Sequence, residues 1–201
     1  MDMTILWTCL AGALLELDTT YAFQLTFSRG IIAGPLLGLI TGDVMTGLQV
    51  GIFTELLFID ISPLGGLLPP SAVVCCTISM ALCSQGIPVY FAFFIGTLSA
   101  ILFSLLEIFA RKNRIGWISR QERKIIHNPL YLSGTIFLSL LFVFIQTFLF
   151  MGSISLLTAA IITKILPSLP EQIHVASRFA FMAVPWIGMA ALIPLFRIKT
   201  R

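Results

Sequence analysis

The sequence contains few charged residues, and this scarcity excludes a soluble globular protein. Asp, Glu, Lys and Arg make up 10% of its 201 residues, against roughly 25% in an ordinary soluble domain. Hydrophobic residues make up 58%, and the mean hydropathy is +1.02. Water does not tolerate so much exposed apolar surface, whereas a lipid bilayer accepts it. We therefore expect an integral membrane protein.

Basic residues are almost absent from the first half of the chain. Residues 1–110 contain one base, Arg29, and seven acids, whereas residues 111–201 contain eleven bases and two acids. The later bases flank apolar segments and lack the interleaved aromatic residues of a base-stacking surface, which argues against a nucleic-acid partner. By the positive-inside rule, the basic loop expected at 111–128 and the basic C-terminus are both predicted to be cytoplasmic.

Groups that perform catalysis or bind metals are also missing. The four cysteines lie in apolar runs with no histidine or carboxylate at metal-ligand spacing, which favours simple packing over zinc or a disulfide. We find no nucleophile with a neighbouring base and no glycine-rich phosphate loop with a lysine. Asp2 occupies the place of a positive leader region, so no signal peptide is expected. We expect no metal, no cofactor and no catalytic residue on this chain.

Three apolar segments are long enough, or nearly so, to cross a bilayer core, which takes about 20 helical residues. They cover 87–109, 130–150 and 179–196. If 111–128 and the C-terminus share one side of the membrane, the stretch 154–166 does not cross. We therefore predict that 154–166 is an interfacial or re-entrant helix.

The first 86 residues contain only short apolar pieces, at 4–15, 30–40, 44–61 and 71–83. Interrupted helices are typical of transporter cores, because irregular backbone is tolerated at membrane depth only where it is buried or lines a cavity. The sequence thus predicts one all-α membrane domain over 1–201, a polytopic helical bundle. Its core, 1–86, consists of broken or re-entrant helices and holds the site, and 130–201 forms scaffold helices.

Glu55 is the first candidate for a ligand-binding residue. It lies 11 residues beyond Val44, about 16 Å along a helix and so near mid-membrane, where a charge costs at least about 2.5 kcal/mol. Such a carboxylate usually faces a cavity or a partner. The structural alternatives are a protonated glutamate bonded to a neighbouring helix, or an ion pair with Arg29.

Two further patterns surround Glu55. Glycines recur every fourth residue at 30, 34, 38 and 42, and again at 47 and 51, which predicts a helix face that another helix can approach closely. The segment 60–71 contains Pro63, Gly65, Gly66, Pro69 and Pro70, so the chain must turn there. Free backbone groups in that turn could bind a polyhydroxylated ligand, or the turn could be an ordinary loop.

The order and spacing of these residues resemble a known family. Arg29, Asp43, Thr46-Gly47, Gly51, Thr54-Glu55-Leu56, Gly65 and Pro70 resemble the membrane subunit IIC of the mannose/fructose/sorbose class of phosphotransferase systems. The detailed resemblance covers about residues 23–80 of the sequence. It implies a protein of the bacterial inner membrane that binds and translocates a hexose or related sugar. It also implies an oligomer with a IID membrane subunit, and phosphate transfer from a phosphorylated cytosolic IIB subunit, with the phosphohistidines on other subunits.

The resemblance also assigns roles to individual residues. Glu55 accepts hydrogen bonds from the sugar, with Thr54 and Ser71 as neighbours. Gln24 stands where the family often has an acid, five residues before Arg29. The structural motif comprises Arg29, Asp43, Gly47, Gly51, Gly65 and Pro70. An ion pair between Arg29 and Asp43 is one expectation, and separate partners for the two are the other.

The sequence also departs from the family pattern. Pro63 and Ser71 stand where the family commonly has asparagine and aspartate, and the chain ends at Arg201, before the further segments of many members. The alternative function is therefore a reduced, non-transporting homologue that acts as an assembly or regulatory membrane subunit. An unrelated ion transporter that uses Glu55 and Asp60 fits the composition but not the ordered motif.

Overall fold

The computed structural model describes residues 3–20, 24–59, 61, 68–127 and 130–196, with side chains for all of them except 20, 118, 120–127, 130, 131 and 194–196. The described residues contain helices and no strand. The elements are α1 (Met3–Thr20), α2 (Gly30–Thr41), α3 (Val44–Phe58), α4 (Ala72–Cys83), α5 (Val89–His127), α6 (Leu130–Ile165), the short η1 (Leu166–Ser168) and α7 (Glu171–Phe196). The predicted all-α membrane bundle is confirmed.

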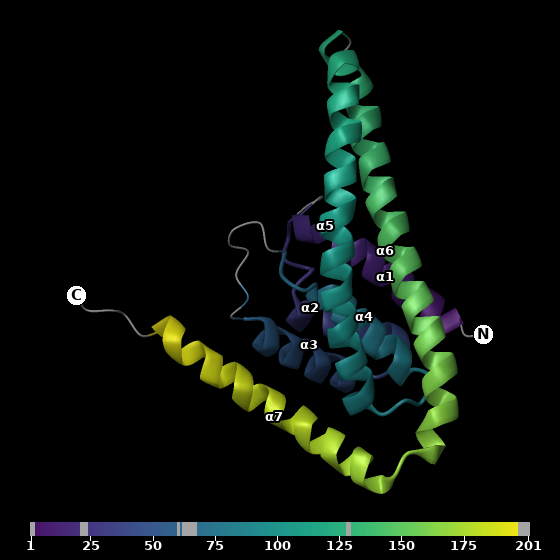
Figure 1. Ribbon diagram of the computed structural model, residues 1–201, viewed down its shortest axis with the longest axis vertical. Helices are drawn as coiled ribbons and strands as arrows, with labels where there is room; N and C mark the ends of the chain where they lie inside the picture. Colours follow the sequence, from purple (N-terminus) through teal and green to yellow (C-terminus); the bar gives the residue numbers. More distant parts are fainter. Residues whose placement is uncertain (1–2, 21–23, 60, 62–67, 128–129, 197–201) are drawn as a thin grey trace.

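Short helices make up the first part of the chain, as predicted. Helices α2, α3 and α4 contain 12, 15 and 12 residues. In contrast, stretches of α5, α6 and α7 are long and apolar enough to cross a membrane. Figure 1 shows the short helices gathered at the base of a long α5–α6 hairpin, with α7 lying across the lower end.

The turn between α2 and α3 is determined by two adjacent residues. Gly42 has φ +84, a left-handed conformation that glycine adopts without steric cost, and it ends α2. Asp43 then begins α3, because its carboxylate accepts hydrogen bonds from the backbone N–H (3.0 Å) and hydroxyl (2.5 Å) of Thr46. These bonds lower the pKa of Asp43.

The glycines of α2 and α3 lie directly against one another. A Cβ atom on Gly34 would collide with the carbonyl oxygen of Gly47, and one on Gly47 with the carbonyl oxygen of Gly34. A Cβ on Gly51 would likewise meet the carbonyl oxygen of Gly30. The two backbones therefore touch, which confirms the close helix contact predicted from the glycine spacing.

Helix α4 occupies the centre of the molecule. Its residues 73–82 are all buried, because α4 packs against α1, α2, α3, α5 and α6. Burial on all sides explains why the sequence of this short helix is apolar around its whole circumference. An aromatic cluster of Phe53, Phe93 and Phe181 then joins α3, α5 and α7.

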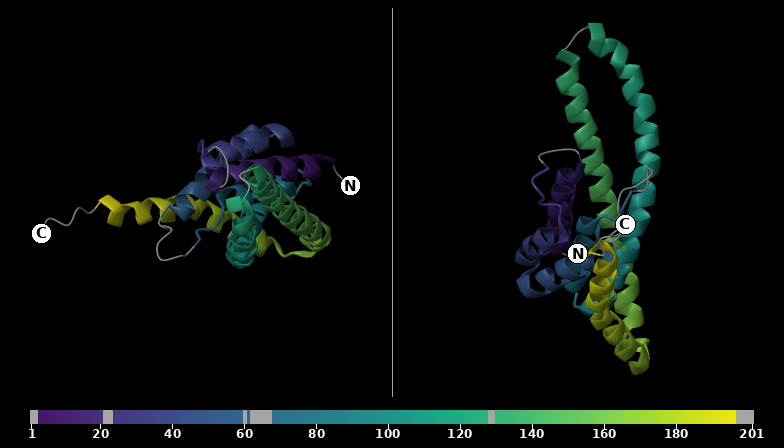
Figure 2. Two further views of the ribbon diagram at one scale, coloured as in Figure 1. Left: turned by 90° about the horizontal axis from the view of Figure 1, so that it is seen from above. Right: turned by 90° about the vertical axis from the view of Figure 1, so that its left-hand side faces the viewer.

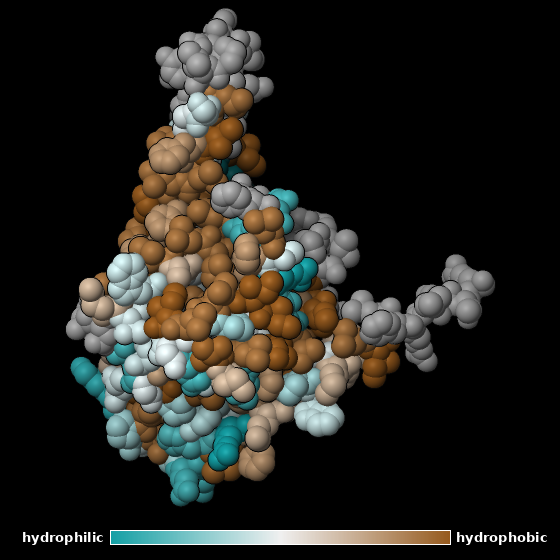
Figure 3. Space-filling model, turned by 180° about the vertical axis from the view of Figure 1, so that it is seen from behind, coloured by the Kyte–Doolittle hydropathy of each residue, from teal (hydrophilic) through white to brown (hydrophobic). Residues whose placement is uncertain are grey.

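The expected basic loop at 111–128 is wrong in its secondary structure, since α5 continues through it to His127. Arginine, lysine, glutamine and glutamate are good helix formers, and the next proline in the sequence is Pro129. With 39 residues, α5 is about 58 Å long. The α5–α6 hairpin therefore extends far beyond the short helices (Figure 2). On the face seen in Figure 3, the described side chains of the hairpin are largely hydrophobic.

The separate helix expected at 154–166 is also wrong. Helix α6 runs unbroken from Leu130 to Ile165 and ends only before Pro167. Gly152 and Ser153 do not interrupt it, because neither residue prevents the helical hydrogen bonds as proline does. Helix α7 continues through Pro185, although proline removes one of its backbone hydrogen bonds.

We predict that Gly34→Ala and Gly47→Ala each lower the free energy of unfolding by about 1 to 3 kcal/mol, because the added methyl group meets backbone that cannot move aside. Gly152→Ala is the matched control, since its Cβ would meet nothing within 4 Å. Thermal unfolding of the purified chain in detergent measures the difference. Equal unfolding temperatures for all three variants would contradict the close contact.

Candidate functional site

A polar cavity of about 650 Å³ lies where the short helices meet α5 and α6. Its wall combines charged and hydroxyl side chains from four helices, α1, α3, α5 and α6, and from the loops that precede α2 and α4. The lining residues are Glu16, Thr19, Ser28, Arg29, Glu55, Phe58, Ile59, Ile61, Leu68, Pro69, Pro70, Ser71, Ala72, Phe103, Ser104, Glu107, Arg111, Val143 and Thr147. A cavity of this size with convergent polar groups is the usual form of a small-molecule site.

Glu55 reaches this cavity from the last turn of α3 and is bound to the start of α2. Its Oε1 accepts a hydrogen bond of 2.6 Å from the backbone N–H of Gly30, and its Oε2 lies 3.5 Å from Nη1 of Arg29. The carboxylate thus sits at the positive end of the α2 dipole. The ion pair with Arg29, an alternative raised from the sequence, is present. The Glu55 side chain keeps 27% of its surface exposed, so the pairing leaves it accessible.

Ser71 lies in the cavity wall and connects α4 with α1. As the N-cap of α4, its hydroxyl accepts a hydrogen bond from the backbone N–H of Val74. The same hydroxyl donates a 2.5 Å hydrogen bond to Oε2 of Glu16 on α1. Ser71 therefore anchors the start of α4 to the cavity wall and orients the Glu16 carboxylate.

An ion cluster forms the part of the wall contributed by α5. Glu107 is buried, and its Oε1 lies 3.0 Å from Nε of Arg111 and 2.6 Å from Nη2 of Arg114. Its Oε2 accepts a hydrogen bond of 3.2 Å from Nε2 of Gln146 on α6. The cluster therefore fastens α5 to α6 at the edge of the cavity.

Two residues that the resemblance places near the sugar lie away from this cavity. Thr54 is fully buried, and its hydroxyl donates to the carbonyl oxygen of Val50 and contacts Cys75. Gln24 is exposed and has φ +51 in the loop before α2. Glu55 and Ser71 do line the cavity, so the structure brings together two of the four expected binding residues.

The structural motif residues have different roles. Arg29 and Asp43 have separate partners, Glu55 and Thr46, so the second of the two alternatives is present and the direct pair is not. Helix α2 holds them apart because it is continuous through Pro35. Gly47 and Gly51 belong to the contact with α2. Pro70 lines the cavity, while Asp60, Pro63, Gly65 and Gly66 fall outside the described residues.

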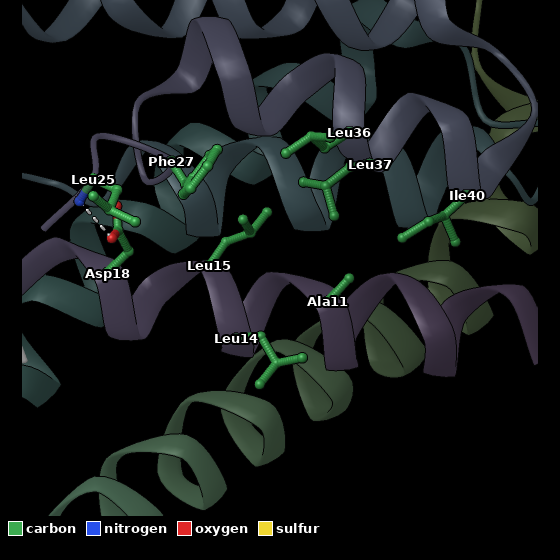
Figure 4. A pocket seen from close by; sticks show the side chains of 9 residues that line it. All are labelled: Ala11, Leu14, Leu15, Asp18, Leu25, Phe27, Leu36, Leu37 and Ile40. Carbon is green, nitrogen blue, oxygen red and sulfur yellow. Dashed lines mark hydrogen bonds between the residues drawn. The ribbon is translucent and has the colours of Figure 1, made fainter. Parts of the chain in front are cut away.

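A second cavity, between α1 and α2, has a different character. It measures about 510 Å³, and aliphatic and aromatic side chains line it apart from Asp18. Figure 4 shows the Asp18 carboxylate turned toward the loop, where it accepts hydrogen bonds from the backbone N–H groups of Leu25 (2.8 Å) and Ser28 (3.3 Å). This carboxylate fixes the loop that leads to Arg29. The apolar lining offers a sugar almost no polar groups.

Sequence reasoning missed Glu16, Glu107 and Arg111 as members of the site. Glu16 and Glu107 each interrupt an apolar helix, and Glu107 is the only charge in the stretch 87–109. An acid inside such a helix usually faces a bundle interior or a cavity, so the signal was available. Among the described residues, no group of three or more His, Cys, Asp or Glu is arranged to hold a metal ion.

Comparison with known proteins identifies the family. A family model described as the sorbose-specific IIC component of the phosphotransferase system matches residues 2–200. The chain belongs to this family. The resemblance noted in the sequence is therefore confirmed, and the protein is a IIC component of the sorbose and mannose class of sugar phosphotransferase systems.

One curated protein and two solved structures are similar to this chain. The IIC chain is 39% identical over 46 residues to an Escherichia coli (strain K12) protein named "Putative N-acetylgalactosamine permease IIC component 2", a match that spans 23% of this chain and 35% of that relative. A solved chain titled "Structure of membrane protein" has a TM-score of 0.70 at 21% identity, with 98% of this chain and 79% of that chain covered. A chain in a complex of the mannose transporter ManYZ and microcin E492 has a TM-score of 0.61 at 20% identity, with the same coverage. These two structures show a shared fold.

We predict that Glu107→Gln lowers the free energy of unfolding of the IIC chain by about 3 kcal/mol, because it leaves the guanidinium groups of Arg111 and Arg114 without their carboxylate. Lys112→Gln is the control, since Lys112 is an exposed neighbour on the same helix. Thermal unfolding in detergent compares the variants. If Glu107→Gln unfolded at the same temperature as Lys112→Gln and the wild type, the importance of the cluster would be contradicted.

Proposed function

We propose that this IIC protein binds a hexose or related sugar in the polar cavity and translocates it across the bacterial inner membrane. The observation that carries the proposal is the position of Glu55 in the cavity wall, where its carboxylate is partly exposed. Membership of the IIC family supplies the sugar as the class of substrate. The cavity supplies a place for it within the helical bundle.

The chemistry of the wall suits a polyhydroxylated ligand. A carboxylate accepts hydrogen bonds from hydroxyl groups, and such charge-assisted bonds are stronger than neutral ones. Arg29 and Arg111 offer donors to sugar oxygens, and Ser28 and Ser104 offer hydroxyls. Phe58 and Phe103 add apolar surface for the carbon face of a sugar ring.

The proposal includes two protein partners. A IID membrane subunit completes the transporter, and a phosphorylated cytosolic IIB subunit supplies phosphate to the sugar, so no phosphohistidine is required of the IIC chain. The mannose transporter that shares this fold was solved as a complex, which supports assembly with other membrane chains. The segment 111–128 and the C-terminus face the cytoplasm, where IIB would approach.

We predict that Glu55→Gln reduces sugar binding at least tenfold, because the amide loses the charge that strengthens hydrogen bonds from sugar hydroxyls. Equilibrium binding of radiolabelled sorbose, mannose and N-acetylgalactosamine to the chain copurified with its IID subunit measures the effect. Glu171→Gln is the control, because Glu171 is an exposed carboxylate at the start of α7. Gel filtration verifies that both variants fold.

Two results would contradict this proposal. If the folded wild-type complex bound none of the sugars, the non-transporting assembly or regulatory subunit would become the better interpretation. If Glu55→Gln and Glu171→Gln bound sugar as the wild type does, the sugar site would lie elsewhere.

The orientation of the chain yields a separate prediction. Lys112 is exposed near the middle of α5, within the segment proposed to be cytoplasmic. A Lys112→Cys variant should react with a membrane-impermeant maleimide in inverted membrane vesicles but not in intact cells. The experiment uses a Cys83→Ser background, because Cys83 is partly exposed whereas Cys9, Cys75 and Cys76 are buried. Labelling in intact cells would reverse the assigned orientation.

A further inference from the structure

Glu16 is a second cavity carboxylate, and it lies outside the motif that carries the family resemblance. It projects from α1, whereas Glu55 belongs to α3, and both line the same cavity. Only 7% of its surface is exposed. Burial of a carboxylate is costly unless partners compensate it, so its position requires an explanation.

The cavity carboxylates differ in how they are compensated. Glu55 is paired with Arg29, and Glu107 with Arg111 and Arg114. Glu16 forms no ion pair with a described residue, and the hydroxyls of Ser71 and Thr19 are its hydrogen-bonding neighbours. A carboxyl group keeps free acceptor positions beyond two such hydrogen bonds, whether it is ionised or protonated. Glu16 therefore retains acceptor capacity for a hydroxyl donor in the cavity.

An independent observation concerns Thr147 on α6. This residue also belongs to the cavity wall and is fully buried. Its hydroxyl has no hydrogen-bond partner among the described residues. Most buried hydroxyls in proteins are hydrogen-bonded, and an unsatisfied one is costly. A hydroxyl of this kind beside a polar cavity points to a ligand group that completes its bonding.

We propose that Glu16, Ser71 and Thr147 form a second part of the sugar site, which binds sugar hydroxyls other than those bound by Glu55. Glu16 accepts a hydrogen bond from one sugar hydroxyl and Thr147 exchanges one with another, while Ser71 holds the Glu16 carboxylate in place. This inference rests on the proposed function of the cavity. It assigns sugar specificity to residues on α1 and α6, in addition to the motif residues of α2 and α3 that carry the family resemblance.

The test compares Glu16→Gln and Thr147→Val with wild type in binding of the parent sugar and its monodeoxy analogues to the IIC–IID complex. We expect each variant to bind the parent sugar about tenfold more weakly. For each variant, one deoxy analogue should bind equally well to the variant and to the wild type. It is the analogue that lacks the sugar hydroxyl bound by the substituted residue. Thr158→Val is the matched control on α6, because the Thr158 hydroxyl donates within its own helix.

The outcomes separate this inference from the proposed function. One outcome disproves the second part of the site while the sugar site stands. In that outcome the wild type binds sugar, Glu55→Gln abolishes binding, and the Glu16 and Thr147 variants bind sugar as the wild type does. If Glu16→Gln weakens every analogue equally, Glu16 has only a structural role and the inference also fails. If the folded wild-type complex binds no sugar, the proposed function itself fails.

Discussion

The backbone contact between α2 and α3 is the constraint on which the site depends. Gly34 and Gly47 allow the two helices to touch, and no larger residue fits at either position. This contact brings the first residue of α2 against the last turn of α3, where the Gly30 N–H binds the Glu55 carboxylate at 2.6 Å. The helix terminus and the opposing charge stabilise each other. The glycine face thus serves to position a carboxylate as well as to pack two helices.

Three carboxylates lie at the cavity among apolar helices, and each has a different set of partners. Glu55 is held by a helix N-terminus and Arg29, Glu107 by two guanidinium groups and an amide, and Glu16 by hydroxyls. Buried charges require such partners because they lose their hydration. The most completely paired carboxylate, Glu107, fastens α5 to α6, whereas the carboxylates with remaining acceptor capacity are those that we assign to the sugar.

Local patterns predicted most of the fold and part of the site. The short helices and the glycine contact were expected, because each depends on residues close in sequence. The pairing of Glu55 with Arg29 was only one of the alternatives that the sequence raised, and the packing of α2 against α3 decided it. The two errors in the long helices had different causes. The charge in 111–127 was interpreted as a loop, although charged residues do not prevent helical hydrogen bonding. The separate helix at 154–166 was inferred from the sidedness of the basic segments, which does not determine where a helix ends. Only the prolines after Ile165 ended α6.

The sequence by itself determined that this protein lies in a membrane, that its N-terminal part consists of short helices, and that it belongs to the IIC family. These properties follow from hydropathy, glycine spacing and the ordered motif, which are local. Only the tertiary structure decided that Glu16, Ser71 and Glu107 share a cavity with Glu55, and that Thr54 turns away from it. Those relationships join α1, α3, α4 and α5 across as many as 91 residues, and the packing of α4 between the other helices brings them together.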